Sequence, residues 1–526
     1  MSEMSRARPN EPPPIVRLMM SAVQLHQQGR FDDAERMYKR ALEVEPNNPD
    51  ALHLLGLIEH KRGRNDEALG LIERAIQAKP REPTFHTNLG QVLRSLNRPA
   101  DAVAAQRRAI ELDPRLAEAH SNLACALYDL KQFDEAEAAA RRAIQLNPQS
   151  HAAYLNLGNA LRERDDFDGA MQAYQQSLRL GRPPEEPLVN IGDMLRSIGR
   201  YDESRAVLEE VLRNAPESIL AHRTLALVLL LHGEFARGWA EAEWRLRAPK
   251  SSGSRFVQPM WDGRGLNGQT VLLHFEQGLG DTIHFARYAP LVAARGGRVI
   301  LEVQPGLARL MRTLNGVDQV VARGEPLPSF DVHAPLLSLP HLFQTTPDTI
   351  PRDVPYLRAD DSLVESWRSR VPIEPGVKRV GLVWAGNPEH VNDRRRSLDP
   401  MHLARLARVA NVRWFSLQLG QPARGATPPP ELNMIDLTAN VTDFADSAAL
   451  LAHLDLLITI DSAPAHLAGA LGRPVWVLLP HVPDWRWQLG RDDSVWYPTM
   501  RLFRQTRPGE WGEVIERVAD AVAAWA

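Results

Sequence analysis

The sequence is poor in cysteine and nearly balanced in charge. Its 526 residues include a single cysteine, Cys125, which excludes an internal disulfide and any zinc or iron–sulfur site built from several thiolates. Its 62 basic and 65 acidic residues leave a net charge of −3, so the whole chain has no electrostatic field that would hold a nucleic-acid backbone. We therefore expect a reducing compartment and no nucleic-acid partner.

Long apolar runs are missing as well. The densest one, Leu225 to Leu231, is far shorter than the roughly 18 residues needed to span a bilayer. The N-terminal segment MSEMSRARPNEPPP is polar and rich in proline, and it lacks the apolar core of a secretory signal. The sequence thus predicts a soluble, cytoplasmic protein without an integral membrane segment.

The remaining composition is that of a globular protein with several domains. Hydrophobic residues make up 44% of the chain and charged residues 24%, which gives no compositional case for disorder, collagen or coiled coil. A length of 526 residues is too great for one compact core. The unusual counts are 40 prolines and 12 tryptophans, and the prolines lead directly to the organisation of the chain.

The first half repeats with a period of 34 residues, the length of one helix–turn–helix unit in tetratricopeptide repeat (TPR) arrays. Small residues let two antiparallel helices approach closely, and a proline stops each second helix. The period is kept by Pro46, Pro80, Pro114, Pro148 and Pro216, by Ala22, Gly56, Gly90, Ala124, Gly158, Gly192 and Ala226, and by Ala34, Ala68, Ala102, Ala136 and Ala170. The pattern resembles TPR proteins and predicts an α-solenoid, a TPR superhelix of about seven repeats over residues 12–249.

Four consecutive repeats carry an asparagine at the same place on their first helix. These residues are Asn88, Asn122, Asn156 and Asn190. A side-chain amide can pair with a peptide backbone of any sequence, and the spacing resembles the asparagine ladder of the O-linked N-acetylglucosamine transferase, whose TPR arm holds protein substrates. The alternative is that each asparagine bonds only its neighbouring repeat. Arg94, Arg162 and Arg196 follow the same phase and either favour an acidic ligand or form a solvated helix face.

The seventh repeat loses its polar face. The run Leu225 to Leu231 is apolar all round, which is typical of a helix buried on every side. Together with Trp239 and Trp244 it predicts that the end of the array docks onto whatever follows.

The second half changes to a βαβ pattern after a linker at residues 250–268, where Pro, Ser and Gly cluster. Short apolar runs alternate with helical stretches, which predicts parallel strands joined by helices. The candidate strands are Thr270–Phe275, Arg298–Val303, Gln319–Val321, Val380–Ala385, Val412–Leu417, Leu456–Ile460 and Val475–Leu479. A polar stretch at 360–378 divides them, so we expect two Rossmann-like lobes at 269–360 and 376–505, followed by a C-terminal helix at 506–526.

Ligands of such sheets bind outside the carboxyl ends of the strands, and three motifs lie there. Gly278, Gly280 and Asp281 follow the first strand, where glycines allow close backbone approach and an aspartate by itself is an ordinary helix cap. Asn387, the basic run Arg394–Arg396 and Ser397 follow the Val380–Ala385 strand. Guanidinium groups suit a diphosphate, although a basic surface loop is the plain alternative.

The third motif follows the Leu456–Ile460 strand. The strand ends in Asp461 and Ser462, and a helix carrying His466 then begins with its free amides at the strand edge. This arrangement predicts an anion site.

The segments GLGDTIHFARYAPL and DLTANVTDFADSAALLAHLDLLITIDSAPAHLAGALGRPVWVL resemble the ADP-heptose:lipopolysaccharide heptosyltransferase family of inverting GT-B glycosyltransferases. The likeness covers roughly residues 270–505. With the repeats in front, the whole chain is similar to bacterial TPR-glycosyltransferases, a group that includes flagellin-modifying enzymes. The resemblance implies an α/β GT-B fold of two Rossmann-like lobes behind the solenoid.

The resemblance also implies roles for single residues. Asp281 matches the catalytic base, with His284 as a rival one turn on. Arg396, Asp461, Ser462 and His466 match donor-binding positions of the family. Gly278, Gly280, Asn387 and Ser397 are also predicted to bind the donor, from their place in the loops after the strands. Neither a metal nor a cofactor is implied, since the nucleotide sugar is a substrate. Two features depart from the family pattern, namely Ala463 in place of a glycine and the tryptophan-rich segment 485–497, and they leave the donor's identity open.

The implied reaction is the transfer of a sugar to a hydroxyl of a protein or peptide held by the TPR groove, with flagellin as one candidate acceptor. The donor is either a nucleoside-diphosphate sugar or a nonulosonic acid carried on cytidine monophosphate. One alternative is a lipopolysaccharide or other glycan transferase that uses its repeats for assembly with other proteins. Another is a non-catalytic TPR scaffold.

Overall fold

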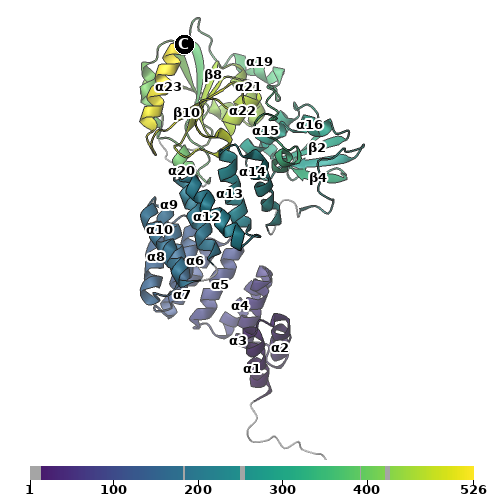
Figure 1. Cartoon of the computed structure of the whole chain (residues 1–526), viewed down its shortest axis with the longest axis vertical. Coiled ribbons are helices and arrows are strands. Elements are labelled where there is room, and N and C mark those ends of the chain that lie inside the picture. The colour runs from purple at the N-terminus through teal and green to yellow at the C-terminus, as the bar shows by residue number, and fades with distance from the viewer. Residues whose placement is uncertain (1–12, 182–183, 249–254, 391, 421–426) are drawn as a thin grey trace, which may run out of the picture. The chain divides into compact units, whose positions relative to one another are not determined.

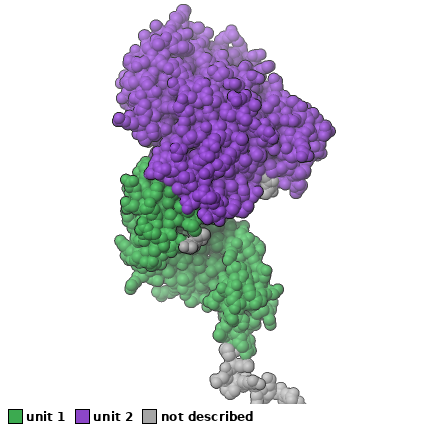
Figure 2. Space-filling model, viewed as in Figure 1, with its two compact units in different colours: residues 1–194 green, residues 195–526 purple. Residues whose placement is uncertain are grey.

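The computed structural model describes residues 13–181, 184–248, 255–390, 392–420 and 427–526 (Figure 1). The chain forms two compact units, residues 1–194 and 195–526 (Figure 2). The division lies inside helix α11 (Glu185–Ser197), so the last repeat helices belong to the same unit as the strands. The start of the expected array at residue 12 and part of the expected linker, residues 250–254, lie outside the described residues.

Paired helices confirm the predicted TPR solenoid in the N-terminal half. Five complete pairs of unit 1 each join a helix of 13 or 14 residues to one of 14. They are α1 (Pro14–Gln27) with α2 (Phe31–Val44), α3 (Pro49–Lys61) with α4 (Asn65–Ala78), α5 (Pro83–Ser95) with α6 (Pro99–Leu112), α7 (Ala117–Asp129) with α8 (Phe133–Leu146), and α9 (His151–Glu163) with α10 (Phe167–Leu180). The prolines of the sequence pattern follow the second helices, as expected.

Small residues act as predicted where the two helices of a repeat meet. Ala34, Ala68 and Ala102 have no exposed surface. At Gly158 an added Cβ would lie 2.5 Å from the ring of Tyr174 on the partner helix. The backbone of α9 therefore lies against that ring, and any side chain there would push the helices apart.

Each first helix ends with one residue in the left-handed conformation, again at 34-residue steps. The residues are Gly29, Gly63, Asn97, Lys131, Asp165, Gly199 and Gly233, with φ between 59° and 82°. The amide after each of them donates to a carbonyl five residues back, as Gln132 does to Leu127 at 2.9 Å. This bond satisfies a carbonyl that the helix end leaves free. At Lys131 the left-handed conformation brings the Cβ atom close to a backbone carbonyl oxygen, which costs steric energy that a glycine does not have.

The last repeat helices share one core with the α/β half inside unit 2. They are α12 (Tyr201–Asn214), α13 (Ile219–Leu231) and α14 (Phe235–Ala242), followed by the turn η1 (Glu243–Arg247). The apolar run Leu225 to Leu231 of α13 is buried except for the partly buried Leu227, as its sequence predicts, whereas Leu220 nearer the start of the helix is exposed. Trp239 donates its indole N–H to the carbonyl of Thr345 at 3.2 Å and meets the ring of Trp485 edge-on. Trp244 stacks on His222 instead, within the repeat itself.

The first sheet has four parallel strands in the order β3-β2-β1-β4. Its strands are β1 (Thr270–His274), β2 (Arg298–Val303), β3 (Gln319–Ala322) and β4 (Val332–Pro335). The second sheet has six parallel strands in the order β10-β9-β8-β5-β6-β7. They are β5 (Lys378–Val383), β6 (Val412–Ser416), β7 (Ile435–Asp436), β8 (Leu456–Ile460), β9 (Val475–Leu479) and β10 (Met500–Arg504).

The second sheet has the strand order of the doubly wound α/β fold, in which ligands bind where the order reverses. That point lies between β5 and β8, and in the first sheet it lies between β1 and β4. The C-terminal half is thus an α/β structure, as predicted. The sequence missed β4, β7 and β10, which are short or interrupted by charged residues, and it placed the other strands within two residues at either end.

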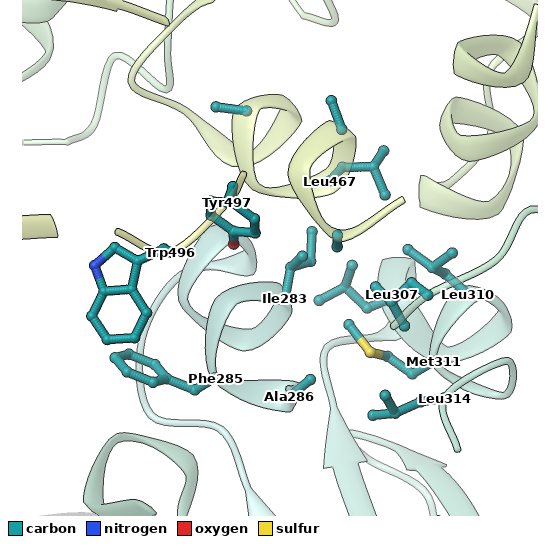
Figure 3. Packing of buried hydrophobic residues seen from close by; sticks show 14 of the residues in the cluster. Ile283, Phe285, Ala286, Leu307, Leu310, Met311, Leu314, Leu467, Trp496 and Tyr497 are labelled. Atoms are coloured by element: carbon teal, nitrogen blue, oxygen red, sulfur yellow. The ribbon is translucent and has the colours of Figure 1, made fainter. Parts of the chain in front are cut away.

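Helices cover the sheets. They are α15 (Leu279–Ala286), α16 (Ala289–Ala293), α17 (Ala308–Met311), α18 (Leu339–Leu342), α19 (Asp361–Arg368), α20 (Asp393–Arg396), α21 (Phe444–Ala452), α22 (Ala463–Ala470) and α23 (Trp511–Trp525). One continuous core runs from α13 and α14 through the first sheet to α21 and α22. In Figure 3, Phe285 of α15 faces the ring of Trp496, and Ile283 points toward Leu307. A second core packs α23 against the other face of the second sheet.

In the parts of the chain that the structure describes, no helix has both the length and the apolar character needed to cross a membrane.

Candidate active site

The site is built where two short helices, α15 after β1 and α22 after β8, pack against each other. Gly280 makes the contact possible, because an added Cβ would lie 3.0 Å from Cδ2 of His466 and 3.4 Å from the backbone of Ala463. The helices bring the carboxyl ends of strands from both sheets to one place. Gly280, predicted at a donor-binding position, lies at this helix contact.

Asp281 has partners at both carboxylate oxygens. Its Oδ2 accepts the backbone N–H of Gly278, the residue before α15, at 2.9 Å. Its Oδ1 accepts an N–H of the Arg486 guanidinium, which forms an ion pair with it. The predicted catalytic base is therefore held in a fixed orientation by a helix cap and a cation.

Arg486 lies in the tryptophan-rich segment and was not among the predicted site residues. It belongs to the short turn η8 (Trp485–Trp487), and its side chain also donates to Asp484 at 2.9 Å. The guanidinium lies over the ring of Trp485, 4.3 Å from its centroid, and the residue is only 8% exposed. Burial by itself would lower the pKa of Arg486, but the charges of Asp484 and Asp281 overcome it and raise that pKa.

Asp461 directly follows β8, close to the same charges. Burial, reinforced by the negative charge of Asp484, raises the pKa of Asp461 to about 6, although Arg396 and Arg486 act in the opposite direction. The backbone carbonyl of Asp461 accepts an N–H of Arg396 at 3.0 Å. Two of the predicted donor-binding residues, from loops after β5 and β8, are thus in direct contact.

The loop after β5 is organised by Asp393 and Ser397. The Ser397 hydroxyl accepts the N–H of Gly386 at 2.9 Å and donates to Asp393 at 2.9 Å, so it is bonded within the loop. A Cβ on Gly386 would lie 2.5 Å from Arg396, which explains the glycine there. Asn387 is exposed, and its Oδ1 accepts the N–H of Glu389.

The two histidines of the motifs meet at one tyrosine. Nδ1 of His284 lies 3.2 Å and Nδ1 of His466 lies 3.1 Å from the hydroxyl of Tyr497. Burial, with nearby arginines, lowers the pKa of both histidines well below the usual value, so both are neutral near pH 7. His284 has no exposed surface, and its Nε2 has no partner among the described residues. Ser462 is bonded to Thr459 and to the carbonyl of Ile460.

Tyr497 is a second residue that the sequence reasoning missed. Burial raises the pKa of its hydroxyl well above the usual value, and the guanidinium of Arg287 lies 4.3 Å from its ring centroid. The density of aromatic residues in the segment 485–497 marks it as unusual in the sequence. No sequence pattern shows, however, that this segment packs against α15 and α22. Trp485 and Trp487 are buried side chains of this region.

In unit 1, three of the four ladder asparagines bond to the preceding repeat. Asn88 Nδ2 lies 2.7 Å from Nε2 of His53, Asn156 donates to the carbonyl of Ser121 at 3.0 Å, and Asn190 donates to Asn159 at 3.1 Å. Nδ2 of Asn122 is buried without a hydrogen-bond partner among the described residues. All four side chains are half-buried.

Arg94 and Arg162, two arginines of the same phase, are paired to acids. Arg94 donates to Asp129 at 2.6 Å, and Arg162 donates to Asp193 at 3.2 Å, each on a neighbouring first helix. These pairs connect successive repeats and offset the positive charge that would otherwise favour an acidic ligand.

No group of three His, Cys, Asp or Glu residues suited to a metal ion occurs within the described ranges.

Comparisons with known proteins match the N-terminal half to repeats and part of the C-terminal half to a glycosyltransferase family. Residues 22–83, 61–117, 121–185 and 189–246 match the tetratricopeptide repeat model, and residues 431–479 match the model of glycosyltransferase family 9 (heptosyltransferase). Protein FlbA of Caulobacter vibrioides is 31% identical over 331 residues, which are 57% of this chain and 54% of that protein. The chain therefore spans about half the length of the curated relative that it matches.

Solved structures resemble the repeats. MamA is 25% identical over 30% of this chain and 92% of its own, with a TM-score of 0.28. PilF of Pseudomonas aeruginosa is 18% identical over 40% of this chain and 96% of its own, with a TM-score of 0.35. The sequence matches together fit a TPR-containing glycosyltransferase.

Proposed function

We propose that this chain, with TPR repeats in one half and a family 9 glycosyltransferase match in the other, is an inverting glycosyltransferase of the GT-B type. It would move a sugar from a nucleotide-sugar donor to a hydroxyl of a protein held by the TPR groove, with flagellin as the candidate acceptor. The observation that carries the proposal is that α15 and α22 pack together, with Asp281 paired to Arg486 on one side and Arg396 bonded to the carbonyl of Asp461 on the other. Asp461 lies inside the matched segment 431–479.

The two parallel sheets support the GT-B assignment. The central strand β1 of the first sheet ends shortly before Asp281, and the central strand β8 of the second sheet ends directly before Asp461. A donor bound at the reversal point of the second sheet would have its sugar directed toward α15. The sheets would then be the cores of the two lobes expected from the sequence.

The donor phosphates would lie near Arg396 and the start of α22. Guanidinium groups and helix amides stabilise phosphate charge, and that charge grows as the bond to the sugar breaks. Arg396 is already held in place by Asp393 and by the carbonyl of Asp461, so it needs little reorganisation. His466 is neutral and lies at the same helix, where it would contact the donor or fix the helix position.

The reaction is a single displacement. Asp281 takes the proton of the acceptor hydroxyl, whose oxygen forms a bond to the anomeric carbon while the bond from that carbon to the phosphate oxygen breaks. The phosphate leaves with the electron pair of that bond. His284 is buried and bonded to Tyr497, so the accessible base is Asp281, whose side chain is 20% exposed.

The TPR array would hold an extended peptide through its asparagines. Asn88 and Asn190 each use one N–H for the preceding repeat, and an amide then still has a second N–H and a carbonyl oxygen to offer. Repeats of this kind present such groups along a concave surface.

The test is a transfer assay with the full-length protein, nucleotide sugars and a cell extract that contains candidate acceptors. Wild-type protein should increase the mass of one acceptor protein by one sugar, and Asp281→Asn should abolish that increase. Asp520→Asn changes an exposed carboxylate and serves as the control that keeps activity. An active Asp281→Asn variant would contradict the role of the base.

A glycan acceptor is the second candidate function, because the matched family is described as heptosyltransferase. It predicts transfer onto a truncated lipopolysaccharide saccharide with no protein acceptor in the assay. Transfer in that mixture, combined with none onto protein, would replace the first candidate. Failure of the protein to bind any nucleotide sugar in calorimetry would favour a non-catalytic scaffold.

A further inference from the structure

Arg486 is a buried arginine of unit 2, outside the predicted site, that bonds two carboxylates. One guanidinium nitrogen bonds Asp281 on α15, and another bonds Asp484 at 2.9 Å, where Asp484 also accepts the backbone N–H of Arg486 at 3.0 Å. The planar guanidinium therefore bridges a carboxylate two residues away and one 205 residues away in the chain. A lysine has a single point charge and could not make this bridge in the same plane.

The surroundings keep Arg486 in that position. Its guanidinium lies 4.3 Å from the ring centroid of Trp485 and 5.6 Å from that of Phe285, and the side chain is 9% exposed. Its Nε is buried and has no partner among the described residues. Both terminal nitrogens of Arg486 bond carboxylates, so its charge is offset by Asp281 and Asp484, and the residue is suited to fixing Asp281 rather than to binding phosphate.

We infer that Arg486 is a positioning residue for Asp281, and that the tryptophan-rich segment contributes to the site by placing Arg486 beside Asp281. The inference deepens the proposed transfer reaction and rests on it. Gly278 holds Oδ2 and Arg486 holds Oδ1, so these two bonds set the plane of the carboxylate that takes the acceptor proton. Asp484 anchors Arg486, and the aromatic rings exclude water around it. Misplacing a catalytic group by about 1 Å costs about 100-fold in rate.

The test is a double-mutant cycle on the full-length protein. Arg486→Gln should lower kcat about 100-fold and leave the KM for the donor unchanged, because it alters the placement of the base and not donor binding. Arg486→Lys should give an intermediate kcat, since it restores the charge without the fork. In an Asp281→Asn background, Arg486→Gln should cause no further loss of the residual single-turnover rate, because the residue acts through Asp281.

Controls separate this role from a structural one. Arg491→Gln removes an arginine of the same segment that pairs with Asp493, and it should leave kcat unchanged. Where Arg486→Gln melts below the assay temperature, Asp484→Asn replaces it, since that change loosens Arg486 while leaving its bond to Asp281. It should also lower kcat, and the loss should again be absent in the Asp281→Asn background.

Three results would overturn the inference. The first is a kcat of Arg486→Gln equal to or above that of the wild type. The second is a rate loss that multiplies with that of Asp281→Asn, which would mean that Arg486 acts independently of Asp281. The third is a rise in donor KM with kcat preserved. An inactive wild type that binds no nucleotide sugar would instead overturn the proposed function itself.

Discussion

Nδ1 of His466 lies 3.1 Å from the hydroxyl of Tyr497, which joins the helix after β8 to the segment before β10. The same hydroxyl lies 3.2 Å from Nδ1 of His284. A hydroxyl has one proton, so it cannot donate to both imidazoles, and at least one of them must donate its Nδ1–H to the oxygen. Tyr497 thus fixes the tautomer of a histidine at the contact between α15 and α22.

Tyr497→Phe should destabilise unit 2 by about 1–3 kcal/mol, because it leaves buried imidazole nitrogens without a partner. Urea unfolding followed by tryptophan fluorescence measures this, since every tryptophan of the chain lies at residue 239 or beyond. Tyr201→Phe, whose ring meets His232 edge-on, is the matched control and should change stability by less than about 0.5 kcal/mol. Equal stabilities of the two variants would show that the hydroxyl of Tyr497 has no structural role.

Asp461 should make unit 2 less stable as the pH rises. Burial and Asp484 raise its pKa to about 6 in the folded protein, against 3.8 for the free group, so the folded state binds the proton more tightly than the unfolded state between these values. Stability from this group is therefore complete below about pH 4 and is lost as the pH rises through about 6.

Asp461→Asn should accordingly be more stable than the wild type at pH 7.5, by on the order of 1–3 kcal/mol, and equal to it at pH 4. Fluorescence-detected urea unfolding at both pH values checks the sign. A stability difference that is the same at the two pH values would contradict the shifted pKa.

Lys131→Gly should stabilise unit 1 by about 1 kcal/mol, because Lys131 has φ of 60°, where a glycine meets no steric cost. The reciprocal change, Gly63→Lys, should destabilise it by a similar amount. Far-UV circular dichroism during urea unfolding reports on these helices, which contain no tryptophan. A loss of stability in Lys131→Gly would mean that the lysine side chain outweighs its backbone strain.

Asn122 and Asn156 should respond differently to alanine. Asn156→Ala removes the bond to Ser121 and should cost about 1 kcal/mol of stability, whereas Asn122→Ala removes a buried amide without a partner and should cost less. If the ladder binds the acceptor, both should raise the KM for the protein acceptor and leave donor hydrolysis unchanged. An unchanged KM in both would leave the ladder with a purely inter-repeat role.

The repeats were the most predictable part of the chain, because the period of 34 residues reports the same local packing many times. Proline, glycine and alanine mark helix ends and close contacts that depend on residues nearby in sequence. What remained open was the choice of partner for Asn88, Asn156 and Arg94, since one amide or guanidinium can face either a ligand or the next repeat. The structure pairs them with neighbouring repeats.

In the α/β half the strands were largely predictable, and the predicted loops contain Asp281, Arg396 and Asp461 at strand ends. The pairing of Asp281 with Arg486 was not predictable, because it joins segments 205 residues apart and neither belongs to a shared local motif. The contacts of Tyr497 were not predictable either, because its hydroxyl contacts histidines of α15 and α22, which follow strands of different sheets. Such contacts depend on tertiary packing, which no local pattern encodes.

The packing of Trp239 against Trp485, described with the last repeat helices, determines where the chain can be divided. A fragment that starts at the linker near residue 250 would lose Phe235 and Trp239 and expose the aromatic faces of Trp485 and Trp496 to water. Arg486, which lies over Trp485, would lose its support at the same time. A fragment of unit 2 that folds and stays in solution should therefore begin before α12, so that it keeps the last repeat helices that complete the core of this unit.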